Sequence, residues 1–200
     1  MSPEILVVWR LLASLMSPGL QQQECEPPVW GDTVTVFSSR VQAYADLRDR
    51  LQAGLRQPVA TDSLTELRSN RQTLAARIRK ARANAKQGDL FSDAIAEQIK
   101  RSLRRAIDAH TWMVIMDDNP GEQPSQVNVE YREGSPLTTM PPNILAALPT
   151  LPGGVEYRFV ERHLILLDTR ALIIVDRIPF AIVDPASQGS CKLQVSSGTS

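Results

Sequence analysis

The chain has 200 residues, of which 42% are hydrophobic and 22% are charged, values typical of globular proteins. A chain of this length can bury a core without metal or disulfide staples, so we expect one packed domain with terminal extensions. The absence of any C-x-x-C pair or Cys/His cluster excludes a structural zinc site.

The N-terminal segment, residues 1–23, resembles a secretory signal peptide. Its apolar run from Ile5 to Met16 is too short to span a bilayer and contains Arg10. Glu4 and the lack of an A-x-A site do not fit this reading, so a misassigned start codon stays open. We expect a secreted or periplasmic protein, with a cytoplasmic one as the alternative, and a Pro-rich joint over residues 24–30.

Two cysteines lie near the ends of the chain, Cys25 and Cys191. In an exported protein they could pair and join the termini. We favour two free thiols in the tails, because a disulfide needs Cα atoms within about 7 Å.

Three amphipathic helices are predicted over residues 38–55, 61–88 and 92–121. Each has apolar residues at three- and four-residue spacing. Ser38 or Ser39 is the expected cap of the first helix, Ser63 with Glu66 forms a capping box for the second, and Ser92 or Asp93 caps the third.

The pattern then changes to the alternation of β-strands. Strands are predicted over residues 126–133, 155–160, 163–167 and 172–176, with a short helical turn at 143–148 before the last three. The runs "LILL" and "LIIV" do not alternate, so both faces of those strands should be covered. We therefore expect a single α+β domain over residues 31–183, with three N-terminal amphipathic helices packed on a small, mainly antiparallel β-meander. Residues 184–200 are Ser/Gly-rich and predict a disordered tail.

Three segments together resemble a family of uncharacterised exported bacterial proteins. They read "AARIRKARANAKQGDLF", "EGSPLTTMPPNILAALPTLPGGVEYRFV" and "LILLDTRALIIVDRIPFAI". The resemblance covers about residues 31–183 and implies export, but no activity, cofactor or catalytic residue. Where this chain has Glu161, the resemblance implies glycine in the hairpin turn.

The charge is distributed unevenly, although the formal net charge is zero. Between Arg68 and Arg105 there are eleven Lys or Arg residues and three acidic ones, a local charge of +8. If the second and third helices lie side by side, they could present one positive surface to nucleic acid or to an anionic lipid or glycan. Its candidate residues are Arg79, Arg82, Lys86, Lys100, Arg101, Arg104 and Arg105. For these basic residues themselves, we favour a solvated or internally paired helix face.

The chain offers few residues for catalysis. His110 and His163 are its only histidines, and it contains no G-x-S-x-G nucleophile turn and no phosphate-binding glycine loop. The run Asp117 to Glu122 lacks the ligand spacing of a calcium loop and reads as a helix end. We therefore predict no catalytic residues, no cofactor and no metal.

The function favoured by this elimination is a non-enzymatic exported domain that binds a protein or an anionic envelope component. One alternative is an intracellular protein that binds nucleic acid through the Arg68–Arg105 helices, although no aromatic residue interleaves the basic ones. A hydrolase with an unrecognised site is a weaker alternative. The sequence leaves the oligomeric state open.

Overall fold

The computed structural model describes residues 30–55, 63–119, 121, 123–135 and 140–187. The signal-peptide-like segment, residues 24–29 of the joint and both cysteines lie outside the described residues. So does the expected tail from residue 188 onward, whereas Pro185–Ser187 form a short 3-10 turn.

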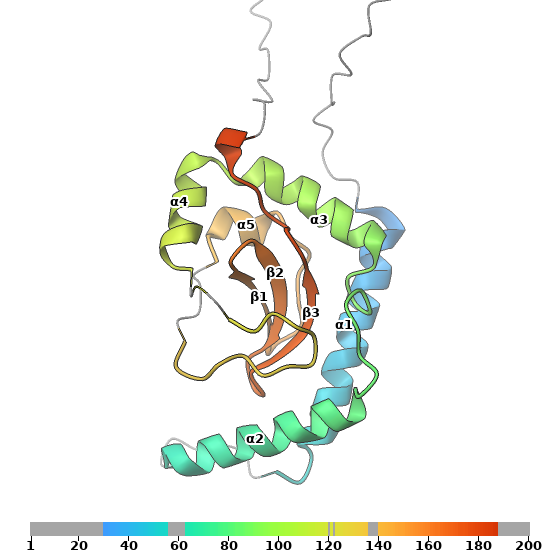
Figure 1. Ribbon diagram of the computed structural model, residues 1–200. Helices are drawn as coiled ribbons and strands as arrows, with labels where there is room; N and C mark the ends of the chain where they lie inside the picture. Colours follow the sequence, from blue (N-terminus) through green and yellow to red (C-terminus); the bar gives the residue numbers. More distant parts are fainter. Residues whose placement is uncertain (1–29, 56–62, 120, 122, 136–139, 188–200) are drawn as a thin grey trace, which may run out of the picture.

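The described chain is α+β, with the helices first and an antiparallel sheet last, as predicted (Figure 1). The helices are α1 (Gly31–Gln52), α2 (Leu64–Ala81), α3 (Asp93–Ala106), α4 (Ala109–Asp117) and α5 (Pro142–Ala146). The strands are β1 (Val155–Val160), β2 (His163–Asp168) and β3 (Ile173–Ile178).

Helix α1 begins seven residues before the predicted start. Ser38 and Ser39 therefore lie inside the helix, so the prediction that one of them caps it is wrong. The added first turns contain Phe37, which is buried and stacks on Phe91 with ring centroids 5.4 Å apart. Burying an aromatic ring gives these turns a tertiary anchor, which outweighs the local preference of serine for a cap.

Helix α2 has the predicted capping box. The Ser63 hydroxyl accepts from the Glu66 backbone N–H, and the Glu66 carboxylate accepts from the Ser63 N–H. The helix ends at Ala81, earlier than the predicted 88. Asn128 explains that end, because its side-chain amide donates to the backbone carbonyls of Arg79 and Arg82 and caps the last turn.

The predicted third helix is divided into two. Ile107 is extended and buried, and Asp108 caps a new helix by accepting from the Thr111 N–H at 2.7 Å. An aspartate side chain that satisfies the first N–H groups of α4 favours this break. The break turns α4 away from α3 (Figure 1).

The predicted strand over 126–133 is wrong. It forms only an isolated bridge, Glu130 to Ile173, and Asn128 has a φ of 64° that a regular strand does not allow. The segment nevertheless follows the edge of β3, because Ile174 donates to the Val129 carbonyl and Tyr131 donates to the Leu172 carbonyl.

The sheet has the order β1-β2-β3 with antiparallel neighbours. Val160 pairs with His163, so Glu161 and Arg162 form the two-residue turn, and Glu161 has a φ of 53°. Between β2 and β3 the register shifts: Leu166 pairs with Asp176 and Leu167 with Ile174. Val175 is therefore the extra residue of a β-bulge.

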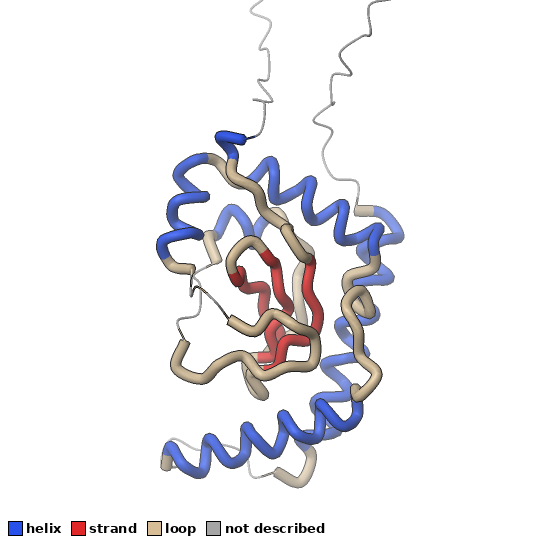
Figure 2. Tube along the Cα trace, viewed as in Figure 1, coloured by secondary structure: helices blue, strands red, loops and turns tan. Residues whose placement is uncertain are grey.

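Both faces of the sheet are covered, as predicted. On one face, buried strand residues such as Leu164, Leu166 and Ile173 share one apolar cluster with residues of all five helices. On the other face, Ile165, Leu167 and Ile174 cluster with Tyr131. Figure 2 shows that a loop crosses this second face, rather than a helix.

Candidate functional site

Helix α3 separates its charged residues from its apolar ones. Ile95, Ile99 and Leu103 are fully buried, whereas three arginines three and four residues apart lie on the exposed side. We call these the α3 basic face: Arg101, Arg104 and Arg105. Within the part of the chain that the structure describes, none of the three forms an ion pair.

The other candidate on α3, Lys100, is only half-exposed. Its ammonium pairs with the Glu97 carboxylate at 3.0 Å, one helical turn away. Asp108 is the first acidic residue of the sequence after α3. Hydrogen bonds from Thr111 lower the pKa of Asp108, which keeps it charged as the cap of α4. Its oxygen is therefore already occupied by a backbone donor.

The α2 candidates have other environments. Arg79 pairs with Glu130 at 3.2 Å. Arg82 points inward: it donates to the Val175 carbonyl at 3.1 Å, and its guanidinium carbon lies 5.1 Å from the centre of the Tyr44 ring. Lys86 is exposed in the turn after α2.

The two groups of candidates do not form one surface. Helix α1 contacts both α2 and α3, and in Figure 1 α2 lies at one end of α1 and α3 at the other. The expectation that α2 and α3 lie side by side is therefore wrong. Of the seven candidates, Arg101, Arg104 and Arg105 are the ones that lie exposed on one helix without an ion pair to a described residue.

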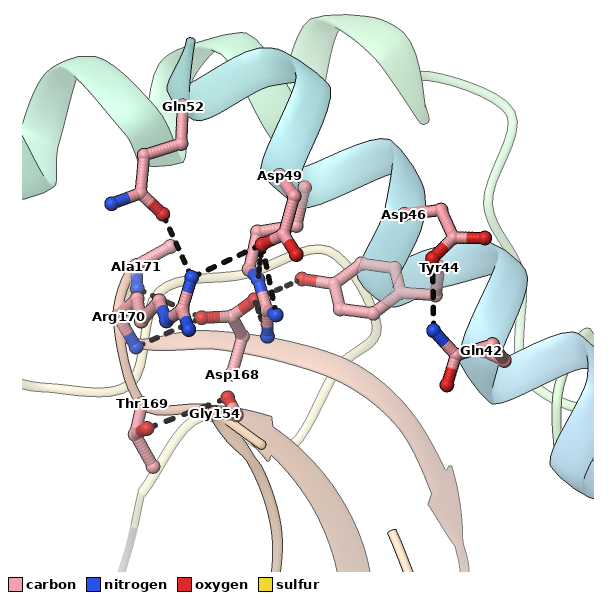
Figure 3. A network of polar contacts seen from close by, with 11 residues as sticks. Gln42, Tyr44, Asp46, Asp49, Gln52, Gly154, Asp168, Thr169, Arg170 and Ala171 are labelled. Atoms are coloured by element: carbon pink, nitrogen blue, oxygen red, sulfur yellow. Dashed lines mark hydrogen bonds and ion pairs between the residues drawn. The ribbon is translucent and has the colours of Figure 1, made fainter. Parts of the chain in front are cut away.

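A buried polar network ties α1 to the turn after β2 (Figure 3). Asp168 is fully buried, and its Oδ2 accepts from the Tyr44 hydroxyl at 2.7 Å. Its Oδ1 accepts from the backbone N–H groups of Arg170 and Ala171, both at 2.9 Å. Asp168 thus begins the turn, a position that favours aspartate.

Arg48 is the charged partner in this network, with 2% of its surface exposed. Its Nη1 lies 3.8 Å from Asp168 Oδ2, and its Nη2 pairs with Asp49 at 3.0 Å. Gly154 has a φ of 82°, and a Cβ there would approach the Arg48 guanidinium to 2.8 Å, so the glycine leaves room for the arginine.

Sequence reasoning missed Arg48, although a signal exists. Val41, Tyr44, Arg48, Leu51 and Leu55 keep a 3-4-3-4 spacing, so Arg48 lies on the apolar stripe of α1. A small surface depression near the network is lined by Asp49, Gln52, Ala53 and Arg170. Because Asp49 and Gln52 both accept from Arg170 there, the polar groups of the depression bond one another.

A second buried carboxylate, Asp176, holds the connection between α2 and α3. Its two oxygens accept from the backbone N–H groups of Gly88, Leu90 and Phe91, at 3.0, 2.7 and 2.8 Å. Both buried carboxylates are therefore saturated by donors of the chain itself, which indicates structural roles.

The histidines lie apart from these carboxylates. His110 is exposed on α4. The His163 Nδ1 accepts from the Phe180 N–H at 3.1 Å, and its Nε2 lies 4.0 Å from Glu161. Among the described residues, no group of three His, Cys, Asp or Glu side chains is placed to hold a metal ion.

Comparison with known proteins gives no relative: no family model, no curated protein and no solved structure matches this chain. Across the described residues, no helix combines the length and the apolar character needed to cross a bilayer.

Proposed function

We propose that this protein is a non-enzymatic exported domain that binds an anionic partner, either a protein or an envelope component, through the α3 basic face. The observation that carries the proposal is the exposure of Arg101, Arg104 and Arg105 on one side of a helix whose other side is buried. Three guanidinium groups on a fixed backbone suit carboxylate, phosphate or sulfate groups.

The rest of the molecule supports this assignment. In this proposal the amphipathic helices cover one face of the sheet, and only their outward sides are free for binding. The polar groups of the surface depression are paired with one another, and both buried carboxylates are saturated, so neither offers a reaction site. Binding through surface charge is the function that these observations favour.

The test compares two triple variants with the same change in net charge. One replaces Arg101, Arg104 and Arg105 by glutamine. The other replaces Lys80, Arg132 and Arg162, which are also exposed and form no ion pair with a described residue. Glutamine is preferable to glutamate, because a negative charge in the last turn of α3 would oppose the helix dipole.

Three separate probes are used: phosphatidylglycerol vesicles, dextran sulfate, and duplex DNA. Each is titrated at several salt concentrations. We expect the α3 variant to lose binding to the vesicles or the sulfated polymer while the control retains it. Equal losses in both variants would contradict a localised face. Binding to DNA alone would instead favour the nucleic-acid alternative, with a salt slope that falls by about one for each contact removed.

Export is tested separately, by cell fractionation with intact-mass measurement. We expect a chain shortened within residues 1–23 in the secreted or periplasmic fraction. A full-length chain in the cytoplasm would contradict export and leave the basic face to be explained by another partner.

A further inference from the structure

The segment that follows β3 is fastened to the β1–β2 turn by a histidine. The Phe180 N–H donates to His163 Nδ1 at 3.1 Å, and the two rings meet edge to face with centroids 5.1 Å apart. Phe180 has a φ of 47°, and 67% of its surface is exposed. A left-handed backbone is unfavourable at a non-glycine residue, so neighbouring contacts must hold it.

The residues that follow Phe180 are anchored in the core. The Ile182 N–H donates to the Arg162 carbonyl at 3.3 Å, and Ala181 and Ile182 are buried in the main apolar cluster. The turn itself is held to the end of α4, because Asn119 both accepts from the Glu161 N–H and donates to the Glu161 carbonyl. The turn is thus the fixed partner, and Phe180, whose side chain is exposed, is the residue that can separate from it.

The hydrogen bond depends on the protonation state of the ring. To accept from Phe180, Nδ1 must carry no proton, so the neutral ring has its proton on Nε2. A second proton would go to Nδ1 and place two donors against each other. The protonated ring would instead be attracted to the Glu161 carboxylate, whose Oε2 lies 4.0 Å from Nε2.

We propose that His163 is a pH-sensitive contact that holds Phe180 when neutral and releases it when protonated. Acidification breaks the bond to the Phe180 N–H and relaxes its left-handed backbone, while Ala181 and Ile182 stay in the core. The device is independent of the α3 basic face.

The charges around the ring place the transition on the acidic side of the usual histidine range. Partial burial and the positive charge of Arg177 on β3 lower the pKa of His163, while Glu161 in the turn opposes this shift. Asn119, just past the end of α4, is uncharged and bonds the Glu161 backbone, and residues 179–183 carry no titratable side chain. Release therefore requires a pH below the ordinary imidazole value of about 6.5.

Hydrogen exchange of the Phe180 amide, measured by NMR between pH 7.5 and pH 5, tests the proposal. Corrected for the intrinsic rate, protection in the wild type should fall by about three- to tenfold as the pH decreases, which corresponds to the loss of one hydrogen bond. A protection factor that stays constant over this range would overturn the proposal.

Two variants isolate the cause. In His163→Asn the side-chain oxygen replaces Nδ1 as acceptor but does not titrate, so the amide should stay protected at every pH. His110→Asn removes the only other histidine and should leave the wild-type pH dependence intact. A pH dependence that persists in His163→Asn, or disappears in His110→Asn, would show that another group is responsible.

Discussion

Asp168 and Asp176 are fully buried carboxylates whose oxygens are occupied by donors from distant parts of the chain. A buried charge is tolerated only with such partners, because its desolvation is otherwise costly. Each carboxylate therefore fixes a junction: Asp168 joins α1 to a turn of the sheet, and Asp176 joins the α2–α3 connection to β3.

The hydroxyl of Tyr44 should contribute measurably to stability. Burial and the Asp168 carboxylate raise the pKa of Tyr44, which keeps the hydroxyl protonated as a donor. Tyr44→Phe leaves the carboxylate one donor short, and we expect the free energy of unfolding to fall by about 2 kcal/mol. Urea denaturation monitored by circular dichroism measures this.

Tyr157→Phe is the matched control. Its hydroxyl donates to the neutral carbonyl of Pro149 at 3.0 Å, so we expect a loss of only about 1 kcal/mol. A loss at Tyr157 equal to that at Tyr44 would mean that the charge of Asp168 adds nothing to the bond.

For individual residues, part of the result was predicted from the sequence. The capping box of Ser63 and Glu66 was predicted, because it follows from local chemistry. The burial of Arg48 was not, because its partner Asp168 lies 120 positions further along the chain and only the fold brings the two together. The inward position of Arg82 likewise depends on the carbonyl of Val175 and the ring of Tyr44.

At the scale of elements, the C-terminal half of helix α2 packs into the core, whereas its N-terminal half is more exposed. Its buried residues are Leu74, Ala75 and Ile78, whereas Leu64 in the first turn is 71% exposed. The first half is held by Arg68 and Arg71, which share the Glu133 carboxylate. Exposed ion pairs contribute little, so the capping box should matter for the order of this half.

Ser63→Ala should therefore loosen the start of α2 without unfolding the domain. We expect a cost of about 1 kcal/mol, seen as faster hydrogen exchange over residues 64–70. Ser69→Ala, at an exposed position inside the same helix, is the control and should leave exchange unchanged. Slower exchange or no change in Ser63→Ala would contradict a stabilising role for the box.

The elements that were mispredicted share one cause. Periodicity marks where a helix or strand is compatible with the sequence, but a competing side-chain bond decides where it ends. Asp108 divides the predicted third helix by capping α4, and Asn128 ends α2 and bends the predicted strand. Both bonds use residues that favour caps and turns, which was the available but overlooked signal.

For the whole molecule, the two faces of the sheet differ in their cover. Leu166 belongs to the cluster that includes the helices, and Leu167 to the cluster beneath the 123–135 loop. We expect Leu166→Ala to cost about 4 kcal/mol and Leu167→Ala about 3 kcal/mol, because a loop can move into a cavity more readily than packed helices. Chemical denaturation of both variants measures the difference, and a larger loss for Leu167→Ala would contradict it.

Global stability should also depend on pH through His163. Because its pKa is lowered in the folded state, the unfolded chain takes up the proton first as the pH falls. The stability that His163 contributes is thus fully present above about pH 6.5 and is lost as the pH falls through the folded-state pKa. Thermal unfolding at pH 7.5 and pH 5 should show a smaller decrease for His163→Asn than for the wild type; equal decreases would contradict the linkage.

The fold class of the whole molecule was accessible from sequence because the change from helical to alternating periodicity is local information. The arrangement of α2 and α3 was not, because it depends on how α1 separates them. The α3 basic face survives this correction, since its three arginines lie within two turns of one helix.

The bulge at Val175 has a consequence for self-association. Residues 128–131 are hydrogen-bonded along the outer edge of β3 up to the bulge. At the bulge itself, the Arg82 side chain donates to the carbonyl of Val175. A strand so bent and occupied offers no straight row of donors and acceptors to a neighbouring molecule. This edge should therefore fail to seed fibrils even in concentrated solution.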